Sequence, residues 1–214
     1  MARMFLLTFF LLLPSLAVAF EPHDGFYLGA YLGAPLAADI GGKDAAGTFQ
    51  LETAGDPLTA FTLGYELLDG SFLGTGGRIE LEYSQRGSSF SEGNFSSGDV
   101  VAVGDLAIES LMLNCFATYR TGTPVSPYLG LGLGAARMTI DDLAVAGLPL
   151  IDDEVTTVAG QGGLGLDIDI TSWLRLDVGY RFFYVRPEFT QSNGSDVTID
   201  YREHSALVGA VVKF

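Results

Sequence analysis

The sequence predicts an all-β protein, an eight-stranded antiparallel up-and-down transmembrane β-barrel. Three observations support this fold class: apolar residues recur at every second position in eight segments, the connections alternate between short and long, and the N-terminus has the pattern of an export signal. Alternation with period two places apolar and polar side chains on opposite faces of a strand. The composition agrees, since 48% of the residues are hydrophobic, only 17% are charged and 28 are glycine.

The N-terminal segment has the three parts of a secretory signal peptide. Arg3 precedes the apolar run Phe5–Leu13, Pro14 interrupts that run, and small residues end at Ala19. The run is too short for a spanning helix, which needs about 18 apolar residues or more. We therefore expect residues 1–19 to be a cleaved signal peptide and residues 20–214 to form the barrel domain.

The first strands are predicted from their alternating faces. The first carries glycines on one parity, and the second places Phe61 and Leu63 opposite Thr62 and Gly64. The third reads RIELEYSQ, with apolar and charged residues in strict alternation. The fourth carries leucines on the parity of Cys115, which should therefore face lipid. All eight expected strands are Gly25–Ala34, Leu58–Leu67, Gly77–Gln85, Asp105–Arg120, Tyr128–Ile140, Thr156–Asp169, Trp173–Pro187 and Val197–Phe214.

The later strands repeat this pattern. In the fifth strand leucines alternate with glycines, and the seventh reads WLRLDVGYRFF with the aliphatic residues on one side. The last strand ends in Phe214, whose parity holds Val212, Ala210 and Val208. A terminal aromatic residue on such a strand is typical of outer-membrane barrels, so the two ends of the chain indicate the same class.

The connections between the predicted strands alternate in length. They measure about 23, nine, 19, seven, 15, three and nine residues in chain order. Short turns at one end and longer loops at the other are typical of transmembrane barrels, and an even strand number puts both termini at the short-turn end. Loops are common recognition sites. An unknown surface ligand would meet the four long loops, where we expect these aromatic residues to be exposed: Phe49, Phe90, Phe95 and Phe189.

The inward parity predicts a polar lumen. An eight-stranded barrel has an interior that side chains can fill. Charged residues there need partners, because an unpaired charge in a low-dielectric space is costly. We therefore expect a hydrogen-bonded ion-pair network made of Glu66, Arg78, Glu80, Glu82, Asn114, Gln161, Asp167, Arg175, Asp177, Arg181 and Lys213.

The composition limits the classes of partner, metal and cofactor that the protein is expected to bind. A net charge of −15 argues against nucleic acid. The single cysteine excludes an internal disulfide, no Cys/His spacing points to a metal site, and no motif points to a cofactor. The loop after the fifth strand offers hard oxygen ligands without EF-hand spacing, which leaves calcium binding as an open alternative at Asp141, Asp142, Asp152, Asp153 and Glu154.

An enzyme is the alternative from another functional class. Catalysis on lipid needs a nucleophile, a base and an orienting group within hydrogen-bond reach, and the candidates are His204, Ser205 and Glu203. Adjacent strand residues point to opposite faces, so His204 and Ser205 should not pair. We expect a non-enzymatic protein, with a lipid-modifying barrel enzyme as the alternative.

Five segments carry a resemblance to a known family. They are RIELEYSQ (78–85), SLMLNCFATY (110–119), PYLGLGLGAAR (127–137), WLRLDVGYRFF (173–183) and HSALVGAVVKF (204–214). Together they resemble the small outer-membrane β-barrel domains, which include OmpA-type, porin-like and surface-antigen barrels. The resemblance implies the outer membrane of a Gram-negative bacterium, contact with membrane lipid and lipopolysaccharide, and recognition of Phe214 by the barrel-assembly machinery. It also implies a structural or surface-interaction role, with weak porin-like permeation at most.

Overall fold

The structure is a computed structural model that describes residues 25–43, 47–72, 75–95, 98–120, 122–192 and 194–214. The predicted signal peptide, residues 1–19, lies outside the described residues, as does His23. No helix within the described ranges is long and apolar enough to cross a membrane.

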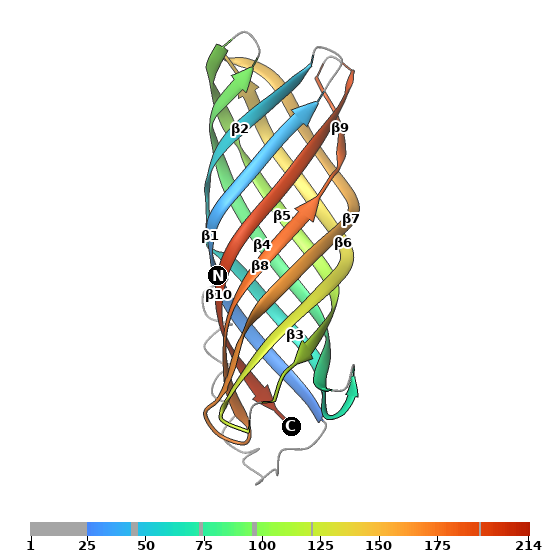
Figure 1. The fold of residues 1–214 in the computed structure, drawn as a ribbon. Helices are drawn as coiled ribbons and strands as arrows, with labels where there is room; N and C mark the ends of the chain where they lie inside the picture. Colours follow the sequence, from blue (N-terminus) through green and yellow to red (C-terminus); the bar gives the residue numbers. More distant parts are fainter. Residues whose placement is uncertain (1–24, 44–46, 73–74, 96–97, 121, 193) are drawn as a thin grey trace, which may run out of the picture.

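Ten antiparallel strands form one closed sheet (Figure 1). Eight of them make a ring, because β1 and β10, the first and last strands, pair with each other from Tyr27↔Lys213 to Lys43↔Thr198. The start of β1 and the end of β10 therefore lie together at the short-turn end of the barrel, where Figure 1 marks the C-terminus. The strands are β1 (Gly25–Lys43), β2 (Thr48–Gly55), β3 (Leu58–Phe72), β4 (Thr75–Phe95), β5 (Gly98–Thr118), β6 (Val125–Val145), β7 (Leu148–Asp169), β8 (Leu174–Val185), β9 (Glu188–Thr190) and β10 (Asp196–Lys213).

Two of the ring strands are interrupted at proline, which explains ten strands where eight were predicted. β2 and β3 are separated by Asp56 and Pro57, and β8 and β9 by Arg186 and Pro187. Proline has no N–H to donate to a ladder. β2 nevertheless continues the line of β3, because it pairs with β1 on one side and β4 on the other.

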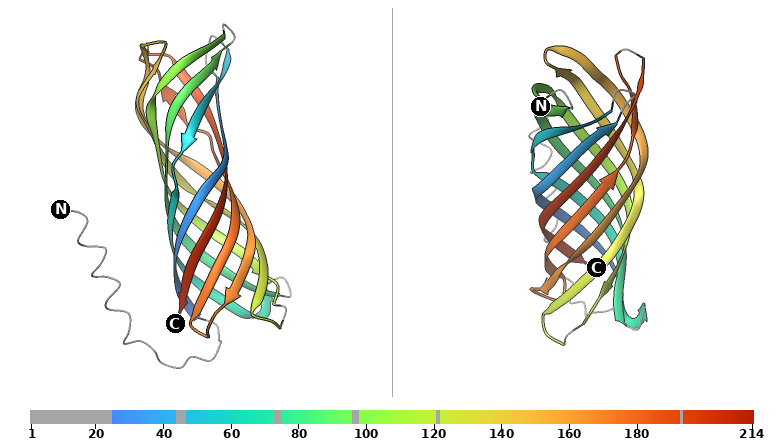
Figure 2. Two further views of the ribbon diagram at one scale, coloured as in Figure 1. Left: turned by 90° about the vertical axis from the view of Figure 1, so that its left-hand side faces the viewer. Right: turned by 45° about the horizontal axis from the view of Figure 1, so that its top comes forward.

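The expected strand lengths were wrong at the long-loop end. β4, β5 and β6 each have 21 residues and β7 has 22, so most residues assigned to long loops belong to strands. Glycines and charged residues hide the alternation there, whereas pairing with both neighbours keeps the backbone extended. The β6–β7 hairpin ends in the two-residue turn Ala146-Gly147, and both have the positive φ that a type I′ turn requires. We call the half of the barrel on the long-loop side the extended half; it contains β2, β9 and the neighbouring parts of the other strands, and it lies opposite the C-terminus (Figure 2).

An apolar belt surrounds the barrel on the side of the short turns. Every ring strand contributes exposed aliphatic or aromatic side chains to it, and they alternate with inward-facing residues. A soluble monomer rarely exposes so continuous an apolar surface, whereas lipid requires one. The belt contains Leu28, Leu32, Phe61, Leu63, Ile79, Leu81, Leu111, Leu113, Leu129, Leu131, Leu133, Leu164, Leu166, Val178 and Val208.

The interior has two regions. Next to the short turns it is polar, and in the extended half a cluster of buried apolar side chains fills it. The predicted exposure of loop aromatics was therefore wrong: Phe49, Phe90 and Phe189 are 5%, 6% and 1% exposed. Phe90 and Phe189 lie beyond the predicted ends of their strands and keep the inward parity of the residues before them, whereas Phe49 lies on β2, where the inward parity is switched relative to β3. The side chain of Phe95 lies outside the described residues. We call this cluster the apolar core; it includes Ile40, Phe49, Leu51, Phe90, Leu106, Ile108, Met138, Ile140, Leu143, Ile151, Phe183, Phe189 and Ile199.

Candidate functional site

The polar lumen is built from inward positions that follow one another along the strands. On β4 these positions are Arg78, Glu80, Glu82, Ser84 and Arg86, and all five are buried. Because successive inward residues are two apart, each meets a different level of the facing strands. The structure places ten of the eleven residues predicted for the lumen in the buried interior, and Lys213 is partly buried at the rim.

Arg78 joins three carboxylates. Its Nη1 donates to Asp167 Oδ2 at 2.6 Å and its Nη2 to Asp177 Oδ2 at 3.1 Å. Its Nε lies 3.6 Å from Glu80 Oε2. The guanidinium also stacks 4.3 Å from the centre of the Tyr128 ring. Asp167 and Asp177 are directly opposite each other on β7 and β8, so a cation between them removes a like-charge repulsion.

A second ion cluster lies at the short-turn rim. Arg175 Nη2 donates to both carboxylate oxygens of Glu66 at 2.6 Å, and Lys213 Nζ donates to Asp169 Oδ1 at 2.6 Å. Arg120 also contacts Glu66. Asp169 and Arg120, which the sequence argument did not include, therefore belong to the same cluster as the predicted residues.

The remaining predicted residues form a hydrogen-bonded layer above Arg78. Asn114 Nδ2 donates to Glu80 Oε1 and Glu82 Oε2, each at 3.2 Å. Gln161 Nε2 donates to Glu82 Oε1 at 3.1 Å and to Asn114 Oδ1 at 2.6 Å. Arg181 lies 3.8 Å from Glu80 and 4.0 Å from Glu82. The structure thus brings these predicted residues from four strands into one network.

Three tyrosines also line the lumen and were not predicted from the sequence. Tyr27 Oη donates to Glu80 Oε2 and Tyr128 Oη to Asp177 Oδ1, both at 2.7 Å, and Tyr31 also reaches Asp177. Each ring lies where glycines leave room: a Cβ added at Gly64 would overlap Tyr27, and one at Gly179 would overlap Tyr128. Glycine on the inward face of a neighbouring strand was the available signal, but sequence alone does not show which tyrosine fills it.

Arg86 and Glu203 lie where the polar region of the lumen meets the apolar core. Arg86 Nε donates to Glu203 Oε1 at 3.3 Å, and its guanidinium lies 4.0 Å from the centre of the Phe183 ring in the apolar core. Tyr201 and Ser205 both donate to Glu203. Arg86 shares the parity of Glu82 and lies one residue past the predicted strand end, so extending the alternation would have found it.

The three candidate catalytic residues do not converge. Glu203 and Ser205 are buried inside the barrel, whereas His204 faces outward, contacts the Tyr180 hydroxyl through Nδ1 and packs 5.0 Å from the Phe182 ring centre. Among the described residues no group of three or more His, Cys, Asp or Glu side chains is placed to hold a metal ion. The acidic residues considered for calcium lie along the β6–β7 hairpin.

Phe214 closes the seam between the first and last strands. Its backbone N–H donates to Phe26 O at 2.9 Å, and the N–H of Lys213 donates to Trp173 O at 2.8 Å. The side chain is partly exposed. It lies near Trp173 at the short-turn end, the level at which aromatic girdles occur.

Just beyond the apolar belt, an ion-pair patch covers the outer face of β5 and β6. Glu109 accepts hydrogen bonds from Tyr83 Oη at 3.0 Å, Gln85 Nε2 at 3.2 Å and Arg137 Nη2 at 2.8 Å. These donors hold the pKa of the Glu109 carboxyl below its usual value. Glu154 lies 3.5 Å from the other side of Arg137. This sector therefore carries more negative than positive charge.

A closed antiparallel sheet with an apolar outer belt and a self-paired polar lumen defines the class of membrane-spanning β-barrels. Within that class the chain belongs to the outer membrane protein beta-barrel domain family, whose model matches residues 5–214. Its place is therefore the bacterial outer membrane. The predicted fold class and localisation are confirmed.

Solved structures show the same fold at low sequence identity. Neisserial surface protein A (NspA) is 21% identical with a TM-score of 0.56, over 91% of this chain and 100% of that chain. AlkL, solved in DMPC lipid bilayers, is 16% identical with a TM-score of 0.55, over 92% and 94%. OprG from Pseudomonas aeruginosa is 13% identical with a TM-score of 0.51, over 92% and 99%. No curated protein sequence matches the chain.

Proposed function

We propose that the protein is a non-enzymatic surface protein of the outer membrane, with a structural or surface-interaction role carried by the extended half. The observation that supports this role is the apolar core, which fills the extended half with buried side chains from β1, β2 and β4–β10. Buried apolar packing makes these hairpins a rigid continuation of the barrel. A rigid projection of this kind presents its tips to a ligand or a neighbouring surface.

The proposed orientation follows the general rule that short turns face the periplasm and longer connections face outward. A labelling experiment tests it, with Leu148→Cys beside the β6–β7 tip and Ser172→Cys in a short turn, both in a Cys115→Ser background. A membrane-impermeant maleimide should label Leu148→Cys on intact cells and Ser172→Cys only after permeabilisation. Labelling of Ser172→Cys alone on intact cells would reverse the orientation and remove the proposed role.

Weak porin-like permeation is the second candidate. It would need a path through both the ion-pair network and the apolar core, and the packing of the two regions favours a closed lumen. A lipid-modifying enzyme is the third, and the separation of His204 from Ser205 and Glu203 argues against that triad. Lipase and deacylase assays of refolded protein against His204→Ala test it: activity abolished by the substitution would restore the enzyme.

We propose that Phe214 is an assembly signal read by the barrel-assembly machinery. The side chain is only partly buried, so its loss removes little packing from the finished barrel. Deleting Phe214 should lower outer-membrane levels several-fold while the refolded barrel unfolds at a urea concentration close to that of the wild type. Quantitative blots of membrane fractions, with deletion of the exposed Ser172 as the control, measure this. Unchanged levels after deletion of Phe214 would exclude the signal role.

A further inference from the structure

Basic residues are scarce on the outside of the extended half. Its outward surface is dominated by exposed or half-buried carboxylates: Asp39, Glu52, Asp56, Glu92, Asp105, Glu109, Asp141, Asp142, Asp152, Asp153, Glu154, Glu188, Asp196 and Asp200. Against these, the described outward cations of this half are Lys43, Arg137, Arg186 and Arg202. Arg137 is enclosed between Glu109 and Glu154. The other three line a single groove.

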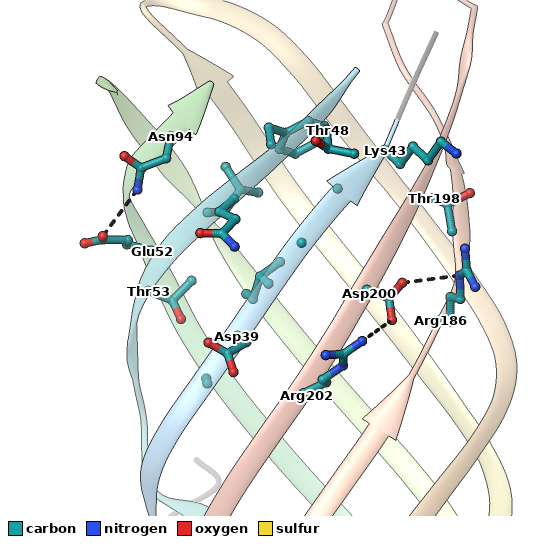
Figure 3. A pocket seen from close by; sticks show the side chains of 17 residues that line it. Asp39, Lys43, Thr48, Glu52, Thr53, Asn94, Arg186, Thr198, Asp200 and Arg202 are labelled. Atoms are coloured by element: carbon teal, nitrogen blue, oxygen red, sulfur yellow. Dashed lines mark hydrogen bonds and ion pairs between the residues drawn. The ribbon is translucent and has the colours of Figure 1, made fainter. Parts of the chain in front are cut away.

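This groove lies on the outer face of β1, β2 and β10 and has a volume of about 980 Å³ (Figure 3). Figure 3 shows Lys43, Arg186 and Arg202 on one side of it, with Glu52 and Asn94 across β1. Gly41 faces outward in the floor, and a Cβ added there would have only Asp200 Cβ, at 3.9 Å, within reach. The missing side chain leaves the groove open in front of the arginines.

The two arginines are held loosely. Arg186 Nε lies 3.4 Å from Asp200 Oδ2 and Arg202 Nη2 lies 3.6 Å from Asp200 Oδ1, while the arginine side chains are 56% and 55% exposed. Exposed ion pairs at such distances contribute little to stability. Asp39 lies opposite Arg202 on β1 without forming an ion pair with it, so among the described residues Asp200 is the only carboxylate paired with the two guanidinium groups. Most of their donors are therefore free for an anion, which they would bind with charge-assisted hydrogen bonds.

The position of Arg186 and Arg202 along the barrel axis indicates which anion they would contact. The outward residues of β8 are Tyr180, Phe182 and Tyr184, and Arg186 follows just past the end of the strand. On β10 the outward residue next to His204 in the same direction is Arg202. Aromatic side chains of this kind lie at the boundary between hydrocarbon and headgroups. The arginines are one outward position beyond that boundary, which is the level of the phosphates on the lipid anchor of lipopolysaccharide. The corresponding sector of β5–β7 carries Glu109, Arg137 and Glu154 and would repel a phosphate.

We propose that Arg186 and Arg202 form a binding site for a phosphate of outer-leaflet lipid A. Lys43 adds positive charge farther along the groove, and Asp200 competes with the phosphate for both guanidinium groups. The site rests on the proposed orientation of the barrel, because only the outer leaflet contains this lipid.

Native mass spectrometry of refolded protein in micelles with purified diphosphoryl lipid A tests the site directly. The variant Arg186→Gln/Arg202→Gln should bind at least about tenfold more weakly, since it removes two charge-assisted contacts. Tyr184 Oη donates to Asp200 Oδ1 at 2.8 Å. Asp200→Asn should bind several-fold more tightly, because it removes the competing charge and retains the oxygen that accepts this hydrogen bond. Gly41→Leu should weaken binding by filling the groove. The matched control is Arg137→Gln, whose affinity should stay within about twofold of wild type.

Two further arms distinguish the source of the anion. In the first arm, wild-type protein should bind dephosphorylated lipid A no more tightly than the double variant binds intact lipid A. In the second arm, millimolar inorganic phosphate should not displace intact lipid A from the wild-type protein. Displacement by inorganic phosphate would identify a free-anion site and overturn the proposal. Equal affinity of wild type and double variant, or an equal loss in Arg137→Gln, would also overturn it.

Heat-dependent gel mobility confirms that each variant is folded. The micelle measurement does not depend on orientation, so its failure can be distinguished from failure of the proposed function. If the maleimide experiment places the extended half outside and lipid A still does not distinguish the variants, only the binding site is wrong.

Discussion

At the scale of single residues, the barrel interior depends on cations shared among several carboxylates. Arg78 contacts Glu80, Asp167 and Asp177, and Arg175 contacts Glu66, Asp167 and Asp169. Both arginines are at most 2% exposed. Removing one partner of a buried ion pair is strongly destabilising, because the other charge stays buried without compensation. The network is therefore sensitive to loss of either cation.

Arg78→Met is expected to lower the free energy of unfolding by about 3–5 kcal/mol, because three carboxylates lose their shared cation. Urea unfolding of refolded protein in micelles measures this. Adding Asp177→Asn should recover part of the loss, since it removes one of the uncompensated charges. The exposed Arg137→Gln serves as the control, with a change of about 0.5 kcal/mol or less. If Arg78→Met and Arg137→Gln were equally stable, the lumen network would contribute nothing measurable.

Glycine–tyrosine packing is a second residue-scale feature. Gly165 and Gly179 are directly opposite each other on β7 and β8, and the ring of Tyr128 lies against both. A Cβ at Gly179 would overlap the Tyr128 hydroxyl and also lie 3.4 Å from Asp177 Oδ1. The glycine thus permits the Tyr128–Asp177 hydrogen bond to form.

Gly179→Ala should destabilise the barrel by about 1–3 kcal/mol through overpacking. Gly160→Ala is a matched control on the same pair of strands, because the nearest atom to its Cβ is Leu133 Cδ2 at 3.8 Å. Tyr128→Phe should relieve much of the Gly179→Ala defect, so the two changes will not be additive in urea unfolding. Full additivity would mean that the overlap with the hydroxyl is not the cause.

At the scale of elements, the short strand β9 continues the sheet beyond the break at Pro187. β9 has three residues, and within the described part of the chain its only ladder is with β10, from Thr198↔Glu188 to Asp196↔Thr190. Its central residue, Phe189, is 1% exposed and belongs to the apolar core. Side-chain burial therefore compensates for the small number of ladder hydrogen bonds.

Phe189→Ala should destabilise the extended half by about 3–5 kcal/mol, the usual cost of such a cavity. Hydrogen exchange measures where the loss falls: amides of β9 and of β10 near Ile199 should exchange faster, while those near Ala210 stay protected. Val158→Ala, at a side chain that is 74% exposed, should leave both regions unchanged. Uniform acceleration along β10 would show that the two halves unfold as one unit.

At the scale of the whole molecule, the barrel has two successive closures along its axis. The ion-pair network fills the part inside the apolar belt, and the apolar core fills the part beyond it. Arg86 touches both regions through Glu203 and Phe183. An ion would have to displace charged partners first and then cross an apolar region where its desolvation is unfavourable.

Wild-type protein in planar bilayers is therefore expected to show no discrete conductance steps between about pH 5 and 8 or across the voltages the bilayer tolerates. A large wide-pore barrel protein recorded in the same bilayers is the positive control. Conductance steps that vanish in a variant with a bulkier lumen residue, such as Gly132→Leu, would revive the porin-like candidate.

The amino-acid sequence alone determined the class, the ring strands and the face of each residue in the belt. This was possible because alternation is a local property: neighbours such as Leu131 and Gly132 face opposite sides whatever lies around them. The sequence also identified eleven of the lumen residues by parity. It did not locate the strand ends of the extended half, because pairing between strands keeps those segments extended despite their loop-like composition.

Only the tertiary structure decided which side chains meet. Tyr31 and Asp177 are 146 residues apart, and Arg86 and Glu203 are 117 apart. Such pairs depend on the stagger of eight strands around a closed ring, which no single segment encodes. The buried positions of Phe49 and Phe189, the division of the lumen into polar and apolar regions, and the groove of Arg186 and Arg202 all arise from that closure.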